Sequence, residues 1–335
     1  MKKVLSIVLL IALILSVAVC AFACKEKEDS TPLRFAAPEG TPALAMTRLV
    51  VDNKTIANKT MEYAVVSPSN IGAEMSSAKS SLVIMPVNAG ANLIRKGANY
   101  KLVSVAVEGS LYIVGKTEKG GEITLDELKG KRIACIGQTG VPGLIFRFVM
   151  NKNGIKMLTD ENAAPKAEEN EIAVQYVADG PAAKTLLAAN KADFALVGEP
   201  AATAFKGALK LNAEMDMQKA YKAANEGSID GYPQAGLFVK TELTTNEKFM
   251  TELFTALKKS RGWVTEHAAE VTEFAKSNLY ESATFPPKSI PRCSIKASAL
   301  TDKDKNDVVA FLKNVMPKEQ DGTAIDWESA KAKLF

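Results

Sequence analysis

Short apolar runs separated by polar loops recur along the chain from residue 33 onward. Leu33–Ala37, Tyr63–Val66 and Leu82–Met85 predict buried strands, and each is followed by a loop and then by apolar residues at helical spacing. Alternation of strand, polar loop and helix is typical of a doubly wound parallel sheet. Ligands of such sheets lie beside the carboxyl ends of the strands, so we expect functional side chains in the loops that follow them.

A second series of the same kind follows an unusually long extended run. Residues 103–114 are extended for longer than one core strand requires and are interrupted by Gly109, which predicts a crossing between two lobes. We expect a return crossing at 236–239. The predicted fold class is α/β, with two doubly wound lobes joined by two hinge strands. Lobe 1 comprises 32–108 and 237–335, and lobe 2 comprises 109–236. Further strands are predicted at 132–136, 174–177 and 194–197, a surface loop at 159–170, and helices around 125–128, 144–153, 181–190, 249–263, 268–276 and 307–313.

The first 24 residues carry the marks of an export signal. A basic start is followed by an almost unbroken apolar run to Ala23, then by Cys24 and a charged stretch. The junction resembles the lipobox of bacterial lipoproteins, in which the cysteine becomes the acylated first residue of the mature chain. We predict a signal peptide at 1–23, a lipid-anchored linker at 24–31 and an extracytoplasmic body tethered to the bacterial cell membrane. Cys20 is the alternative acylation site, and an uncleaved membrane helix is the alternative to cleavage.

Charge and histidine content narrow the possible functions. Subtracting Lys2 and Lys3 from the formal net charge of +4 leaves +2, with acids and bases interspersed, so we expect no nucleic-acid partner. His267 is the only histidine in the chain, which argues against histidine-based metal sites and histidine-dependent nucleophilic catalysis. We therefore expect no metal and no cofactor. Cys135 and Cys293 lie outside the leader. A disulfide between them is one possibility in an oxidising compartment, and the sequence does not decide it.

Three motifs resemble those of one family of transport proteins. They are a helix and strand at Leu125–Ile133, a turn and strand at Asn190–Ala202, and a late helix pair at Trp263–Glu270. Together with the exported start, they resemble the substrate-binding proteins of ATP-driven importers. The most similar branch is the one that binds nitrate, taurine, alkanesulfonates or thiamine pyrimidines, and the resemblance covers about Leu33–Lys276.

The resemblance implies a type II periplasmic-binding-protein fold whose two lobes close on a ligand by hinge motion. It further implies that the chain is not an enzyme and delivers a small organic ligand to the membrane permease of an ABC-type importer. We expect a monomer. The sequence departs from the family pattern at Ser81, where an acid is common, and at Ala268, where proline is usual.

Two other functions remain open for the same fold. One is a pyrimidine-synthesis-like enzyme, although that class resembles this chain less because it relies on a histidine and a cysteine-rich motif in its cleft. The other is a ligand-sensing surface lipoprotein that has no transporter.

The candidate ligand-binding residues lie in the predicted loops. Several of them have a structural alternative: Thr41, Ser67, Asn88 and Asp179 could cap helices, and Tyr232 could cover the hinge. The loop at 137–143 could bind an anion through backbone N–H groups, but its glycine spacing matches neither a dinucleotide fingerprint nor a Walker loop. The candidates are Glu39, Gly40, Thr41, Ser67, Asn88, Gly109, Ser110, Gln138, Thr139, Gly140, Asp179, Glu199 and Tyr232.

The charges in these loops bear on the class of ligand. The loops contain Glu39, Asp179 and Glu199 but neither arginine nor lysine. A sulfonate or nitrate site would be expected to use a charged hydrogen bond from such a base. The sequence therefore favours a nitrogen-bearing small organic ligand, such as an aminopyrimidine, with sulfonate or nitrate as the alternatives.

Overall fold

The computed structural model describes residues 31–160, 163–226, 231–319 and 321–335. The fold occupies Leu33–Phe335. The predicted signal peptide and both candidate acylation sites, Cys20 and Cys24, lie outside the described residues. Within the described ranges, no helix combines the length and the apolar composition that a membrane crossing requires.

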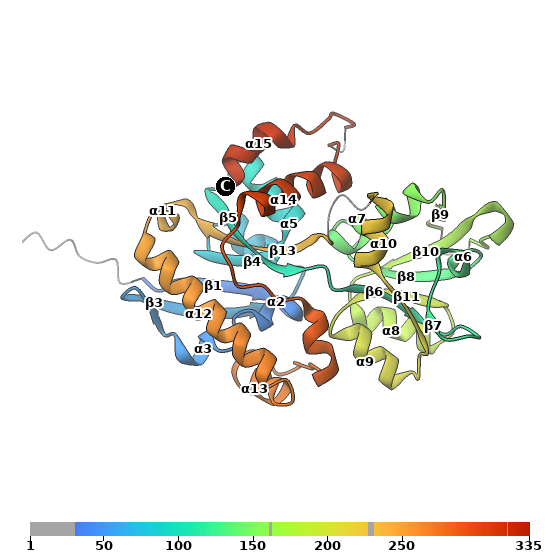
Figure 1. Ribbon diagram of the computed structural model, residues 1–335, viewed down its shortest axis with the longest axis horizontal. Helices are drawn as coiled ribbons and strands as arrows, with labels where there is room; N and C mark the ends of the chain where they lie inside the picture. Colours follow the sequence, from blue (N-terminus) through green and yellow to red (C-terminus); the bar gives the residue numbers. More distant parts are fainter. Residues whose placement is uncertain (1–30, 161–162, 227–230, 320) are drawn as a thin grey trace, which may run out of the picture. The chain divides into compact units, whose positions relative to one another are not determined.

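The first sheet has six strands in the order β2-β3-β1-β4-β13-β5 (Figure 1). β1 pairs in parallel with β3 and β4, as predicted, whereas β13 is antiparallel to both of its neighbours. Successive side chains of a strand point to opposite faces, so Phe35 and Ala37 enter one core and Ala36 enters another. The strands are β1 (Leu33–Pro38), β2 (Thr55–Ile56), β3 (Lys59–Val66), β4 (Leu82–Pro86), β5 (Tyr100–Glu108) and β13 (Pro233–Lys240).

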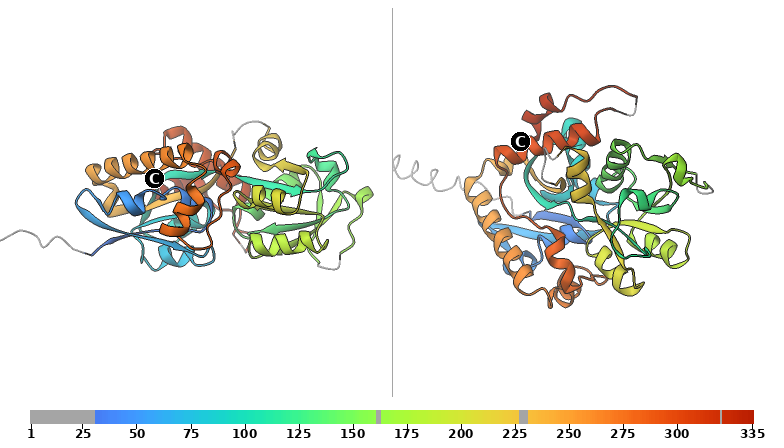
Figure 2. Two further views of the ribbon diagram at one scale, coloured as in Figure 1. Left: turned by 90° about the horizontal axis from the view of Figure 1, so that it is seen from below. Right: turned by 45° about the vertical axis from the view of Figure 1, so that its right-hand side comes forward.

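Helices from both ends of the chain cover this sheet, as the two views of Figure 2 show. Phe249 and Leu253 of α12 pack on the face that carries Phe35, whereas α5, α14 and α15 pack on the opposite face and bury Trp327 completely. The predicted helices at 249–263, 268–276 and 307–313 are confirmed, and α15 and the 3-10 helix η2 were not predicted. The helices are α2 (Thr41–Leu44), α3 (Leu49–Asp52), α4 (Ile71–Ser76), α5 (Val87–Arg95), α11 (Thr241–Thr244), α12 (Glu247–Glu266), α13 (Val271–Asn278), η2 (Pro287–Cys293), α14 (Asp302–Val315) and α15 (Trp327–Leu334).

The second sheet has seven strands in the order β7-β12-β6-β11-β8-β10-β9. Its central strands β8, β10 and β11 run parallel, whereas β6 is antiparallel to β11 and β12. Cys135 and Leu196 face α7, and Ala134 and Val197 face α8 and α9. The elements are β6 (Leu111–Gly115), β7 (Gly121–Glu122), α6 (Leu125–Leu128), β8 (Arg132–Ile136), α7 (Val141–Lys152), β9 (Lys156–Leu158), η1 (Ala167–Glu169), β10 (Glu171–Val177), α8 (Gly180–Ala188), β11 (Phe194–Gly198), α9 (Ala201–Ala208), β12 (Ala213–Asp216) and α10 (Met217–Ala224).

Two connections join the sheets. The extended run at 103–114 becomes β5 in the first sheet and β6 in the second, separated at Gly109 and Ser110 as the glycine predicts. The return connection differs from the prediction, because residues 236–239 lie wholly within β13 and pair with β4 and β5. The crossing therefore precedes β13 and includes Gly231 and Tyr232. The fold class, α/β with two lobes joined by two connections, is confirmed.

Candidate functional site

The loops at the carboxyl ends of parallel strands carry most of the predicted residues. Thr41 follows β1 and Asn88 follows β4 in the first lobe, while Thr139 follows β8 and Glu199 follows β11 in the second. Two hydrogen bonds join these loops. Thr41 Oγ1 donates to the Glu199 carbonyl oxygen over 2.7 Å, and Asn88 Nδ2 donates to the Thr139 carbonyl oxygen over 3.2 Å. The loops of the two lobes therefore face each other. We call Thr41, Asn88, Ser110, Thr139 and Glu199 the interlobe site.

Thr41 does not cap its helix, contrary to one of its two predicted roles. Gly40 occupies the N-cap position of α2 without a side-chain cap, and its φ of 88° lies in the region that favours glycine. The Gly40 N–H donates instead to the hydroxyl of Tyr280 over 3.0 Å. Thr41 is buried with its hydroxyl committed to the opposite lobe. Its side chain therefore joins the two lobes.

Asn88 supplies the only side-chain amide among the five residues of the interlobe site. It lies in the first turn of α5, caps no backbone N–H, and is only 4% exposed. Its Nδ2 reaches Thr139, but its Oδ1 is buried and has no hydrogen-bond partner among the described residues. A buried amide oxygen without a partner is costly.

Glu199 is buried and fully engaged. Its carboxylate accepts hydrogen bonds from the Thr203 N–H over 3.1 Å and the Thr203 hydroxyl over 2.9 Å. Arg292 Nε also donates to it. Burial raises the pKa of the Glu199 carboxyl, and the charge of Arg292 and the bonds from Thr203 oppose that rise. The carboxylate is held by the protein itself.

Arg292 is the functional residue that the sequence analysis missed. It lies in η2, whose Ile290 and Cys293 belong to the core of the first lobe. Its guanidinium forms a bidentate pair with Glu214 of β12, over 2.9 and 3.0 Å, and its Cζ lies 3.9 Å from the centre of the Tyr112 ring in β6. We call Arg292, Glu199, Glu214 and Tyr112 the Arg292 bridge. No motif surrounds Arg292, and 93 residues separate it from Glu199, so no local pattern indicated this contact.

The Arg292 bridge changes the charge argument drawn from the loops. Glu199 is paired, and the hydrogen bonds from Arg292 are the main cause that lowers the pKa of the Glu214 carboxyl. Asp179 caps α8 by accepting a hydrogen bond from the Ala182 N–H over 2.9 Å. Glu39 is exposed. The expectation that these acids face a cationic ligand is therefore not supported by their contacts.

The remaining candidates have structural partners. Ser67 bonds the neighbouring Ser69 hydroxyl over 3.0 Å and caps no helix, since α4 begins four residues later at Ile71. Gln138 is exposed and its carbonyl oxygen accepts from Arg147 over 2.7 Å. Gly140 occupies the N-cap position of α7.

The two connections between the lobes touch each other. Tyr232 is 2% exposed, donates to Gln218 Oε1 over 2.7 Å and packs on Tyr221, so its ring lies within the protein core. The Gly109 N–H donates to the Tyr232 carbonyl oxygen over 2.9 Å. Ser110 is buried, and its N–H donates to Gln234 Oε1 over 2.9 Å. These contacts indicate that Gly109, Ser110 and Tyr232 shape the hinge.

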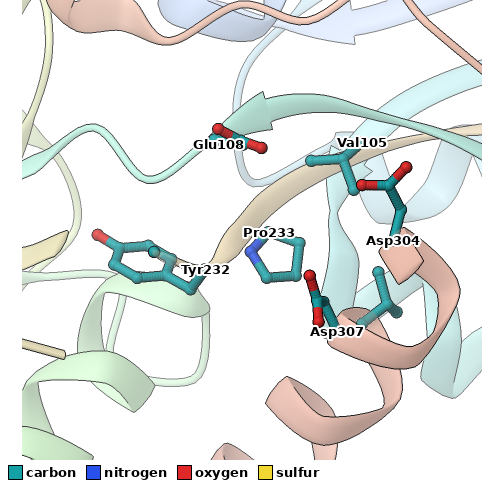
Figure 3. Close-up of a pocket in the computed structure, with 8 residues that line it drawn as sticks. Val105, Glu108, Tyr232, Pro233, Asp304 and Asp307 are labelled. Atoms are coloured by element: carbon teal, nitrogen blue, oxygen red, sulfur yellow. The ribbon is translucent and has the colours of Figure 1, made fainter. Parts of the chain in front are cut away.

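Figure 3 shows a small pocket beside this hinge, where Glu108, Asp304 and Asp307 lie around Pro233, with Tyr232 to one side. Its volume of about 30 Å³ is far below that of a small-molecule site. Each carboxylate also has a partner: Lys296 for Glu108, Thr301 for Asp304 and Lys303 for Asp307. No group of metal-binding side chains occurs within the part of the chain that the structure describes.

A larger cavity of about 930 Å³ lies beside the Arg292 bridge. It is bordered by α9 of the second lobe and by η2 of the first. Its volume is in the range of small-molecule sites. Two of its three cations are paired, since Lys206 and Arg292 both contact Glu214. The lining residues are Thr203, Ala204, Lys206, Gly207, Pro286, Pro287, Lys288 and Arg292.

Cys135 and Cys293 do not form the disulfide that the sequence left open. Both are free and buried, one in β8 and the other at the end of η2. Burial raises the pKa of each thiol to about 12. Neither thiol is poised for nucleophilic chemistry.

Solved structures share this fold, although no protein-family model matches the sequence and no curated protein is found to be related to it. An ABC transporter structure from Parabacteroides distasonis is 21% identical, covers 88% of this chain and 97% of its own, and has a TM-score of 0.68. The alkanesulfonate-binding protein SsuA from Xanthomonas axonopodis pv. citri, bound to MOPS, is 16% identical, with coverage of 83% and 90% and a TM-score of 0.54.

A third similar structure names the fold. The Candida albicans CA3427 gene product, described as having the generic periplasmic binding protein structural fold, is 12% identical, with coverage of 90% and 95% and a TM-score of 0.56. At these identities the likeness defines architecture. The chain has the periplasmic binding protein fold.

Proposed function

We propose that this chain is an extracytoplasmic solute-binding protein that captures a small organic ligand between its lobes and delivers it to the permease of an ABC-type importer. The observation that carries the proposal is the interlobe site, where loops from both sheets meet through the Thr41–Glu199 and Asn88–Thr139 hydrogen bonds. Support comes from similar structures, which include SsuA bound to MOPS and a ligand-binding component of an ABC-type import system from Staphylococcus aureus.

Capture would work by hinge motion. Only the connections around Gly109 and Tyr232 need to change their dihedral angles, because each lobe keeps its own sheet. Closure forms the Arg292 bridge and the Thr41–Glu199 and Asn88–Thr139 hydrogen bonds. These contacts would hold the ligand until the permease opens the lobes. The ligand classes to be tested are nitrogen-bearing small organic molecules, sulfonates and nitrate.

The leader fits this function. Acylation of Cys24, or of Cys20, would tether the monomeric protein near its permease and raise their effective concentration. Replacing Cys24 by serine should abolish incorporation of labelled fatty acid into the protein, whereas the same change at Cys20 should not. Loss of the label on the Cys20 change alone would assign acylation to that residue.

Binding can be tested with a panel of sulfonates, nitrate, pyrimidines, flavins and polyamines in thermal-shift and calorimetric titrations. A ligand at a hundred times its Kd should stabilise the protein by about 2.7 kcal/mol. Mass spectrometry should recover that ligand chemically unchanged. Conversion of the ligand would contradict the proposal and favour the enzyme of the same fold.

A further inference from the structure

We infer that Asn88 makes lobe closure conditional on a ligand that donates a hydrogen bond, so that the ligand presents an N–H group to Asn88 Oδ1. The inference rests on the proposed function and names the chemical class of its ligand. It starts from the one residue of the interlobe site that has both a contact across the lobes and a buried atom without a partner.

The orientation of the Asn88 amide is fixed by its neighbour. The Thr139 carbonyl oxygen is an acceptor, so the atom that faces it over 3.2 Å must be Nδ2, the donor. Exchanging the amide oxygen and nitrogen would place two acceptors against each other. Oδ1 therefore points away from Thr139, within a side chain that is 4% exposed. It requires a donor that the described part of the chain does not supply.

Closure changes the surroundings of the two amide atoms differently. With the lobes apart, water can hydrate both. When the lobes meet, Nδ2 exchanges water for the Thr139 carbonyl oxygen, but Oδ1 loses water without a replacement from the protein. An unmade buried hydrogen bond costs more than a formed one contributes. Asn88 therefore opposes closure of the empty protein, and a ligand that donates to Oδ1 removes that opposition.

This requirement selects among the ligands considered above. Nitrate and simple alkanesulfonates without an amino group carry only acceptors at neutral pH, so they leave Oδ1 without a partner. Amines, amides and aminopyrimidines carry the donor. The donor need not be charged. Glu199 already bonds Arg292 and Asp179 already bonds a backbone N–H of α8, so neither acid requires a cationic ligand.

The first test needs no ligand. Small-angle X-ray scattering of the ligand-free protein should show N88A more compact than wild type, because the change removes the oxygen that opposes closure. N88D should be less compact, since a carboxylate would face the Thr139 carbonyl oxygen. N92A is the matched control, as Asn92 lies in the same helix and its Oδ1 already accepts from Arg95 over 2.9 Å. Ligand-free N88A that is no more compact than wild type would overturn the inference.

The second test uses matched probes in calorimetric titrations. 4-Amino-2-methylpyrimidine should bind wild type at least about tenfold more tightly than its 4-dimethylamino analogue, which lacks the N–H. N88A should lose that preference. Nitrate or methanesulfonate that binds wild type and N88A equally would overturn the inference while leaving the proposed function intact. If no probe binds, the scattering comparison decides, because it does not depend on the transport assignment.

Discussion

The guanidinium of Arg292 is clamped between Glu214 and the face of the Tyr112 ring, with its Cζ 3.9 Å from the ring centre. Arg292 belongs to a segment packed in the first lobe, whereas Glu214 and Tyr112 belong to the second sheet. The pair therefore exists only while the lobes are together. It favours closure, whereas the orphaned Asn88 oxygen opposes it.

Replacing Arg292 by alanine should weaken ligand binding by about tenfold or more, because it leaves the buried Glu199 without its cation. Lysine at this position keeps the charge but loses the bidentate fork, so R292K should lie between wild type and R292A. R132A serves as the control, since Arg132 pairs with Asp193 within the second lobe, at the end of β8 remote from the interlobe loops. Calorimetry gives the Kd values. If R292A bound the ligand as tightly as wild type, the Arg292 bridge would not contribute to lobe closure.

The Thr41 hydroxyl can be tested with a valine of nearly the same shape. T41V removes the 2.7 Å bond to the Glu199 carbonyl oxygen and should cost about 1 kcal/mol of ligand binding. Thr47 is equally buried nearby, but its hydroxyl makes only a 3.5 Å contact with Ala43 in its own lobe. T47V should therefore leave the Kd unchanged. If T41V and T47V changed the Kd equally, the Thr41 hydroxyl would have a role in folding and none specific to ligand binding.

Gly109 at the hinge should not tolerate alanine. A Cβ there would lie 2.7 Å from Tyr232 Cζ and 2.7 Å from Gln218 Cγ, so the hinge would have to shift. We expect G109A to lower the free energy of unfolding by about 1 to 3 kcal/mol. G72A is the control, because a Cβ at Gly72 meets nothing within 4 Å. Denaturant titrations compare the variants, and an unchanged midpoint for G109A would show that the hinge adapts freely.

Acid should destabilise the protein through Glu74. The hydrogen bond from Arg34 is the main cause that lowers the pKa of the Glu74 carboxyl to about 2, from 4.5. A carboxyl whose pKa is depressed on folding stabilises the protein above its unfolded pKa, and that contribution is lost as the pH falls from about 4.5 toward 2. E74Q should flatten the dependence of unfolding free energy on pH in that window. E62Q, which alters the exposed partner of Arg34, should retain most of it.

The sequence predicted the long core strands because each leaves a local apolar run, whereas the short strands β2, β7, β9 and β12 were not predicted. Runs such as Leu82–Met85 are buried on both faces of the first sheet, and that environment leaves a continuous apolar run in the sequence. The loop positions followed from the same rule, which placed Thr41 and Asn88 at the carboxyl ends of strands. Their roles did not follow, since a threonine before a proline is typical of a cap, and only the fold brings the Glu199 carbonyl oxygen to Thr41.

Arg292 shows the limit of sequence reasoning most clearly. Its partners come from three different strands or strand ends, at Tyr112, Glu199 and Glu214. A long-range ion pair leaves no periodic trace in a single sequence. This missing residue bears on the class of ligand inferred from the loop acids, because Arg292 pairs with Glu199, one of the three acids on which that inference relied.

Because β13 lies between β4 and β5 but comes late in the sequence, the first sheet is completed late in folding. β13 inserts between β4 and β5, so the first sheet is completed by residues that are synthesised after the whole second sheet. The second lobe is continuous in sequence and can form from contacts nearer in the chain, whereas β4 and β5 keep open hydrogen-bonding edges until β13 arrives. The first lobe is therefore the last to be completed, and a chain cut short before Pro233 would leave one edge of β4 unpaired and β5 without its neighbour in the sheet.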